Sequence, residues 1–228
     1  MTARPSNLSP TLVALLAASS VACAGGFDGP SVQLGVGLAN SKYEAVFPGW
    51  FQTTPSKTGF HGLVAVGYSK AMGSFNLAGS AFYVLGDQKA GTTNQQWDSS
   101  EKDSVSLQLG KTYGVTLEPG FNLSESTLLY VKLGFARSTA TWTFARTATT
   151  WADSYSGTAA FNDLTFGAGA KHRLAPALYA FAEIQKTSFK RKGVDMTVRN
   201  HTTNTDATYT DYFKPASLTC FAGVGYSF

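Results

Sequence analysis

The last twelve residues of the chain, Ser217 to Phe228, alternate between two kinds of side chain. A period of two predicts a strand whose two faces meet different environments. The strand ends in Tyr226 and Phe228, and aromatic rings in such a place anchor a membrane barrel at the edge of the hydrocarbon. The last strand of a soluble sandwich or lipocalin is the alternative. The apolar face consists of Leu218, Cys220, Ala222, Val224, Tyr226 and Phe228.

The same alternation predicts seven earlier strands, which cover about residues 31–43, 58–69, 74–85, 104–123, 129–136, 163–171 and 178–185. Short turns near residues 71, 125 and 175 alternate along the chain with long loops near 51, 94, 149 and 198. This layout predicts an all-β fold, an eight-stranded antiparallel transmembrane β-barrel with up-and-down topology. An even number of strands would put both termini on the periplasmic side.

The composition favours a barrel that faces lipid. Charged residues make up 14% of the chain, against about a quarter in average soluble proteins. No apolar run approaches the roughly 20 residues that a membrane helix needs. The net charge of +4 comes without a basic helix or an aromatic RNA-binding motif, so we expect no nucleic-acid partner.

The N-terminus has the features of an export signal. Arg4 precedes an apolar core from Leu12 to Ala18, and Ala22-Cys23-Ala24 is an A-x-A cleavage site. We therefore expect residues 1–24 to be a signal peptide and residues 25–228 to form the barrel domain. Cleavage before Cys23, as in a lipoprotein, is the rival. After cleavage at Ala24 only Cys220 remains, so no intrachain disulfide is expected.

Face composition separates a membrane barrel from a lipocalin. A lipocalin would turn its apolar face inward and leave Gly, Ser and Thr to face water, whereas soluble surfaces use Lys and Glu freely. Small polar residues instead suit the narrow inside of a membrane barrel. Four apolar residues of neighbouring strands are therefore expected to contact lipid: Leu107, Leu109, Val131 and Leu133.

The predicted inner face carries charges of both signs in mid-strand: Glu118, Lys132, Asp163, Lys171 and Glu183. Buried charges are tolerable when they are paired, so we expect an internal network of ion pairs. Glu118 lies seven residues before Glu125 and Lys132 seven after it, in the turn that joins their strands. This count places Glu118 and Lys132 near cross-strand register, with Glu183 as a third member across the lumen.

Three local features carry a resemblance to a known family. They are the strand that ends in Phe228, the segment from Leu117 to Phe121 with Tyr130 to Phe135 after it, and Ala182-Glu183. On these features the mature chain resembles the opacity-type porin family, the small outer-membrane barrels similar to OmpA and OmpX. No peptidoglycan-binding domain is expected.

The resemblance implies a location in the outer membrane of a Gram-negative bacterium. It implies that the barrel-assembly machinery reads the end marked by Tyr226 and Phe228. It further implies a structural or surface-interaction role for a monomer with at most a narrow pore. A porin-type channel for small solutes and an adhesin that acts through long external loops remain alternatives, with the host or surface ligand unknown.

Some small outer-membrane barrels are lipid-modifying enzymes, which raises the question of whether this chain carries catalytic residues. The chain has three imidazoles, His61, His172 and His201, and lacks the His-x-Ser pair of outer-membrane deacylases. His61 is expected to be a hydrogen-bonded interior residue. The scattered His and Cys give no metal-ligand spacing. We therefore predict no enzyme activity and no cofactor.

A basic trio, Lys190, Arg191 and Lys192, falls in the last predicted loop. These charges can simply be solvated. Alternatively, they contact the phosphates of lipopolysaccharide just outside the membrane.

Overall fold

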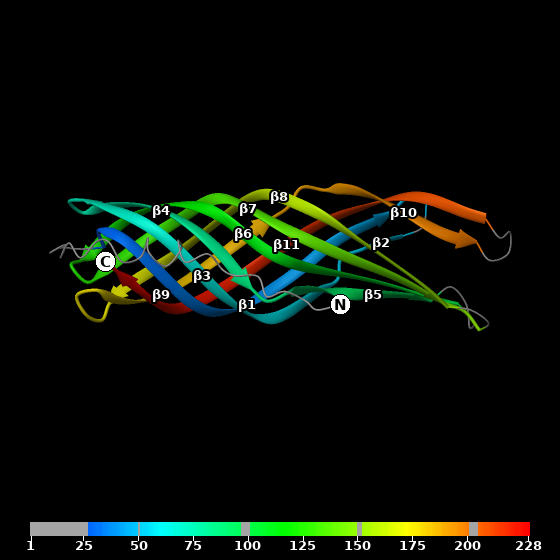
Figure 1. Ribbon diagram of the computed structural model, residues 1–228, viewed down its shortest axis with the longest axis horizontal. Helices are drawn as coiled ribbons and strands as arrows, with labels where there is room; N and C mark the ends of the chain where they lie inside the picture. Colours follow the sequence, from blue (N-terminus) through cyan, green and yellow to red (C-terminus); the bar gives the residue numbers. More distant parts are fainter. Residues whose placement is uncertain (1–26, 50, 97–100, 150–151, 201–204) are drawn as a thin grey trace, which may run out of the picture.

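The computed structural model describes residues 27–49, 51–96, 101–149, 152–200 and 205–228. These residues form antiparallel strands in one closed sheet (Figure 1). The export signal stays a prediction, because residues 1–26 lie outside the described part. Among the described residues, no helix is long and apolar enough to cross a membrane.

Eight strands make up the ring of the barrel, in the order β1-β3-β4-β6-β7-β8-β9-β11, and β11 pairs back onto β1. This ring confirms the predicted fold class. Its strands are β1 (Gly29–Phe47), β3 (Ser56–Met72), β4 (Phe75–Leu85), β6 (Lys102–Ser124), β7 (Thr127–Thr147), β8 (Ala152–Arg173), β9 (Leu178–Ser188) and β11 (Thr205–Ser227). The closing ladder runs from Ser31↔Ser227 to Val46↔Tyr212, so neither strand leaves an open edge along this length.

Three further strands are not part of the ring and pair with ring strands where these extend past their neighbours. β2 (Phe51–Thr53) pairs with β1, β5 (Gln88–Gln96) pairs with β6, and β10 (Lys192–Asn200) pairs with β11. The chain turns a corner between β4 and β5 at Gly86, whose φ of 90° is a left-handed conformation that suits glycine.

Along its axis the barrel has two halves, which differ in whether the apolar side chains point outward or inward. The half that holds the turns 73–74, 125–126 and 174–177 also holds Phe228. In this half, called the membrane half below, apolar side chains point outward. On β7, for example, Val131 is 49% and Leu133 is 55% exposed. Outward apolar residues run from Phe60 to Tyr68 on β3 and from Leu218 to Tyr226 on β11, which matches the 9–11 residues of a membrane-spanning strand.

The pattern inverts in the other half, called the distal half below. Along β7 the outward positions change from Leu133 and Phe135 to Arg137, Thr139 and Thr141, while the alternation itself continues without a break. The inward positions change in the opposite sense and become apolar. The distal half is therefore a barrel that meets water outside and packs a hydrophobic core inside.

The core of the distal half contains side chains from five ring strands, from β5 and β10, and from the segment after β9: Tyr43, Ala45, Phe47, Ala90, Val105, Leu107, Leu109, Ala140, Trp142, Phe144, Ala159, Phe161, Phe189, Met196 and Phe213. Trp142 and Phe213 stack with ring centroids 6.5 Å apart. Tyr43 donates a hydrogen bond to the Val105 carbonyl, 2.9 Å away, so its hydroxyl is satisfied inside this core.

The prediction of long loops is wrong for three of the four segments. The segments expected to be loops near residues 94, 149 and 198 are largely strands, namely β5, the ends of β7 and β8, and β10 with the start of β11. Their outward faces carry Thr, Ser and Gln, so their composition looked like that of loops. The alternation was present but inverted, with the polar residues outside.

The prediction that Leu107 and Leu109 contact lipid is also wrong. They do not face lipid, because they are 2% and 1% exposed inside the distal core. The β6–β7 ladder shifts register between Leu109 and Thr112, and this bulge moves the odd-numbered residues from the inner to the outer face. Val115 and Leu117, beyond the bulge, do face outward at 57% and 51% exposure.

A charge introduced on the two halves tests this boundary. Leu133→Arg places a cation on the lipid-facing band and should cost about 2–4 kcal/mol of unfolding free energy if it lies near the midplane. Thr141→Arg, outward on the same strand in the distal half, should change it by no more than about 0.5 kcal/mol. Urea unfolding from lipid vesicles measures both, and an equal cost at the two positions would mean that the lipid boundary is misplaced.

Candidate functional site

Four charged side chains meet inside the membrane half, and they are called the interior network below. Lys132 on β7 lies 2.7 and 2.8 Å from the two carboxylate oxygens of Glu183 on β9. Lys171 on β8 donates to Glu118 Oε2 on β6 at 3.1 Å. Lys132 Nζ also lies 3.7 Å from Glu118 Oε1 and so links the two pairs. Two lysines balance two glutamates, and each residue is at most 5% exposed.

Neutral side chains complete the network's hydrogen bonds. Tyr130 donates to Glu183 Oε2 at 2.7 Å. Ser80 and Thr116 donate to Glu118 Oε1 at 2.6 and 3.1 Å. The Lys171 ammonium lies 4.8 Å from the centre of the Tyr130 ring, close enough for a cation–π contact. Desolvated charges need this many partners to be stable inside a protein.

Turn geometry places Glu118 opposite Lys132. The neighbouring pairs Leu117↔Leu133 and Gly120↔Tyr130 set the register of this hairpin. Counting from the turn therefore found the right relation between the two strands. The ion pair of Lys132 with Glu183 is much shorter, however, and it passes over the single intervening strand β8. Glu183 therefore belongs to the network as predicted, but it lies on the next strand but one and not across the lumen.

Glycine makes room for the network. A Cβ on Gly169 of β8 would meet the Tyr130 hydroxyl at 2.5 Å, so the absence of a side chain there lets the tyrosine ring lie across the strand toward Glu183. Tyr130, Ser80 and Thr116 also belong to the network, although they are uncharged and were not predicted as members. Their alternation with outward apolar residues was the available signal, but it cannot say which inward residues touch.

Asp163 does not join the interior network. It lies on β8 beyond Thr165, where the β8–β9 ladder ends, and its Oδ1 accepts a hydrogen bond from the Leu164 amide. It lines a shallow depression on the outer wall together with Lys190, Arg191 and Lys214. Asp163 has the inward parity of β8, but β9 no longer pairs with β8 at this level, so its carboxylate lies in this depression and the prediction that it joins the network is wrong.

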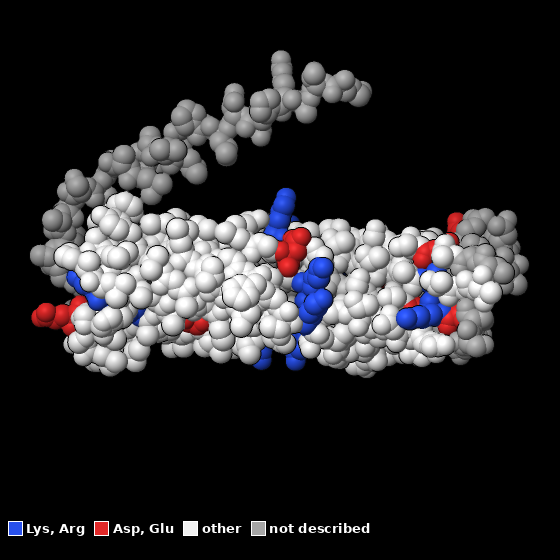
Figure 2. Space-filling model, turned by 90° about the horizontal axis from the view of Figure 1, so that it is seen from below, with Lys and Arg blue, Asp and Glu red and all other residues white. Residues whose placement is uncertain are grey.

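The predicted basic trio lies where the lipid-facing band meets the distal half. Arg191 forms an ion pair with Glu44 on β1, and Lys192 Nζ lies 3.4 Å from the Ala160 carbonyl oxygen. Further exposed lysines lie near this level, including Lys42, Lys186 and Lys214. Figure 2 shows Lys and Arg gathered at mid-length, next to a white, uncharged stretch of wall. These six cations are called the cationic belt below.

The end of the chain closes the barrel. Phe228 donates its backbone N–H to the Pro30 carbonyl at 2.9 Å. The rings of Tyr226 and Phe228 meet edge to face with centroids 5.1 Å apart, and Tyr226 is 46% exposed on the outer wall. The geometry suits an aromatic anchor at the rim of the hydrocarbon band.

The histidines do not assemble a reactive group in the described part. His61 is buried, but neither ring nitrogen has a hydrogen-bond partner, which corrects the expectation of a hydrogen-bonded interior residue. His172 Nδ1 lies 3.0 Å from the Thr127 hydroxyl at the turn end of the barrel. His201 lies outside the described residues. Within the described ranges, no three His, Cys, Asp or Glu side chains gather as metal ligands would.

A lipid-facing wall, a closed ring of eight strands and a filled, charge-balanced interior define a small membrane β-barrel. A family model described as "Outer membrane protein beta-barrel domain" matches residues 11–210. The chain therefore belongs to this family, and it is an outer-membrane barrel of the Gram-negative type. This confirms the resemblance to the small outer-membrane barrels. A search of curated protein sequences finds no match.

Solved structures of other proteins also match this chain. The outer membrane protein OprG from Pseudomonas aeruginosa superposes with a TM-score of 0.50 at 11% identity, over 90% of this chain and 98% of that one. The attachment invasion locus protein Ail of Yersinia pestis gives 0.40 at 18% identity, over 87% and 99%. The outer membrane protease OmpT from Escherichia coli gives 0.48 at 12% identity, over 92% and 100%.

Substitutions in the interior network should reveal which pair dominates. Lys132→Met leaves Glu183 without its ammonium partner and should cost about 3–5 kcal/mol of unfolding free energy. Glu118 keeps Lys171, so adding Glu118→Gln should recover little of that loss. Adding Glu183→Gln should recover most of it, because the uncompensated charge disappears.

Urea unfolding of the single and double variants from vesicles measures these differences. Strictly additive costs in both double variants would mean that Lys132 is not coupled to either carboxylate.

Proposed function

We propose that this outer-membrane barrel is a closed barrel that presents a rigid, water-facing β-structure at the cell surface for contact with other molecules. The observation that carries the proposal is that side chains fill the inside at both levels. The interior network and its aromatic neighbours occupy the membrane half, and the hydrophobic core occupies the distal half. On this proposal the protein acts through its outer surface and has at most a narrow pore.

The aromatic neighbours of the network support a closed interior. Phe82, Phe181 and Phe221 are 3–4% exposed and pack with Leu63 and Tyr179 into one buried cluster inside the membrane half. A solute pathway for small polar molecules would need a continuous wet channel past these rings. The porin-type alternative is therefore the less favoured one, and its test is conductance.

The distal half supports a role in surface interaction. Paired strands replace flexible loops there, so its outward Thr, Ser and Gln side chains sit on a fixed framework. A rigid surface loses less conformational entropy when it binds a partner. A structural role that needs no partner would use the same framework.

Orientation follows from the same proposal. The turns and Phe228 would lie on the periplasmic side and the distal half outside the cell, with short turns inside as in other bacterial barrels. The cationic belt would then lie at the level of the lipopolysaccharide phosphates, which attract Lys and Arg. We expect a monomer without a cofactor and without catalytic activity, since the described histidines lie apart from one another.

Conductance tests whether the barrel is closed. The refolded protein, checked by its heat-modifiable gel mobility, should produce no unit steps in a planar lipid bilayer. On the proposed function, the side chains that fill both halves leave no continuous water column for ions. Steady steps of uniform size would contradict the closed barrel and favour the porin-type channel.

Labelling of intact cells tests the orientation. In a Cys220→Ala background, Thr141→Cys should react with a membrane-impermeant maleimide, whereas Glu125→Cys, in a turn at the opposite end, should react only after lysis. Both positions are exposed, so accessibility within the protein is matched. The reverse result would put the distal half in the periplasm and would remove lipopolysaccharide as the partner of the cationic belt.

A further inference from the structure

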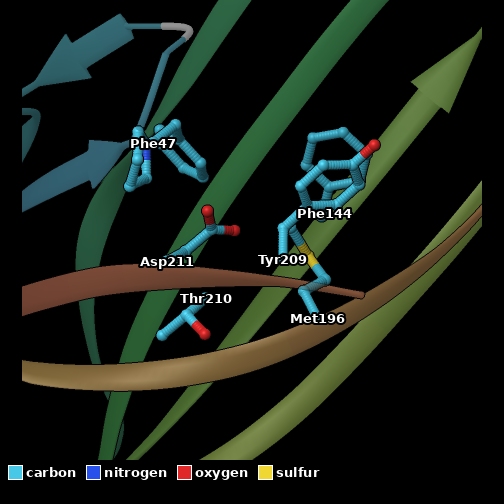
Figure 3. Close-up of a pocket in the computed structure, with 7 residues that line it drawn as sticks. Phe47, Phe144, Met196, Tyr209, Thr210 and Asp211 are labelled. Atoms are coloured by element: carbon cyan, nitrogen blue, oxygen red, sulfur yellow. The ribbon is translucent and has the colours of Figure 1, made fainter. Parts of the chain in front are cut away.

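A pocket opens at the far end of the distal half, where β1, β7, β10 and β11 come together. It has a cavity volume of about 80 Å³ and is lined by Phe47, Pro48, Phe144, Met196, Tyr209, Thr210 and Asp211. Figure 3 shows the Asp211 carboxylate rising from β11, with Phe47 on one side and Phe144, Tyr209 and Met196 on the other. The lining is mainly aromatic and apolar, with one carboxylate in it.

The carboxylate of Asp211 has no counterpart in this pocket. Its residue is 4% exposed, and its Oδ2 is buried without a hydrogen-bond partner. Its cross-strand partner on β10 is the apolar Val194, and the next residue, Tyr212, pairs with Val46 on β1. A buried carboxylate without a partner destabilises the fold. In the same protein Glu118 and Glu183, equally buried, are fully partnered.

The aromatic rings decide what kind of partner fits. Phe47, Phe144 and Tyr209 present the faces and edges that surround organic cations in aromatic cages. An anionic ligand is excluded by the carboxylate, and a bare metal ion would find one acidic side chain among apolar neighbours. An alkylammonium group matches both parts, because its N–H bonds or positive charge meet Asp211 and its carbons meet the rings.

We propose that this pocket binds a small alkylammonium group, with Asp211 as its counter-ion and Phe47, Phe144 and Met196 as the apolar wall. The cavity is about half the size of one that holds benzene in an engineered protein, about 150 Å³, so it suits a head group with a short chain. Tyr209 is 43% exposed at the mouth of the pocket, which leaves access from water. The remainder of a larger ligand would extend outward past Tyr209.

Protonation gives the site a pH dependence. Burial raises the pKa of the Asp211 carboxyl to about 6. Asp211 and Tyr209 are the titratable residues among the described lining, and on β10 the exposed Asp195 accepts a hydrogen bond from Thr210. A neutral acid at pH 5 attracts an ammonium ion weakly, and the ionised form predominates at pH 7.5. Affinity should therefore rise by about tenfold between these values.

Methyl signals of methionine report on the pocket directly. The protein carries ¹³C-methyl methionine in lipid nanodiscs, and Met196 lines the pocket while Met72, 55% exposed on the outer wall near the opposite end, is the internal control. Titration with n-butylammonium should shift the Met196 signal and leave Met72 in place. 1-Butanol, equal in size but uncharged, should bind about 10–100-fold more weakly, the usual value of a charge-assisted hydrogen bond.

Two variants complete the test. Asp211→Asn keeps the shape of the side chain. It should lower the affinity for n-butylammonium to that for 1-butanol and remove the dependence of this affinity on pH. Asp195→Asn changes the net charge equally on the outer face of β10 and should leave binding unchanged. Butanol and the amine binding with equal affinity, or an Asp211→Asn protein that binds the amine as well as the unsubstituted protein, would overturn the proposal. So would an amine titration that moves neither methyl signal.

Discussion

Closure of the backbone ladder is the constraint on which the rest of this structure depends. In hydrocarbon each unpaired N–H and C=O costs several kcal/mol, so a sheet can cross a membrane only when its first and last strands pair. Here β11 pairs with β1 over sixteen residue pairs, from Ser31↔Ser227 to Val46↔Tyr212. Closure also fixes which residues point inward on all strands, and a ring of eight strands leaves space for side chains alone.

A narrow interior explains both the small residues and the interior network. Glycines such as Gly134, whose Cβ would lie 2.0 Å from the Val115 carbonyl oxygen, let the strands coil closely. Long side chains then extend over neighbouring strands where space remains, as Lys132 does over β8 to reach Glu183. The charges balance and are hydrogen-bonded, so the inside of the membrane half is polar yet filled.

The inversion of pattern at mid-length reflects a change of solvent rather than a change of fold. The same strands continue through it: β7 keeps its parity from Thr127 to Thr147, while β6 bulges between Leu109 and Thr112. Outside the lipid, apolar residues gain more from the interior, and polar residues from water. The distal half is therefore built like a soluble barrel on a membrane base, and its opening holds the carboxylate of Asp211.

Sequence alone determined the barrel class, its strand order and the lipid-facing pattern of the membrane half, because period-two alternation and short turns are local properties of the chain. It also placed Glu118 opposite Lys132, since a hairpin register depends only on distance from the turn. Tertiary structure decided the rest. The β6 bulge buried Leu107 and Leu109, the β7–β8 and β8–β9 ladders set how close Glu183 lies to Lys132, and the interrupted wall separated Asp163 from them. Each of these outcomes depends on contacts between strands far apart in the sequence, and alternation within one strand carries no information about them.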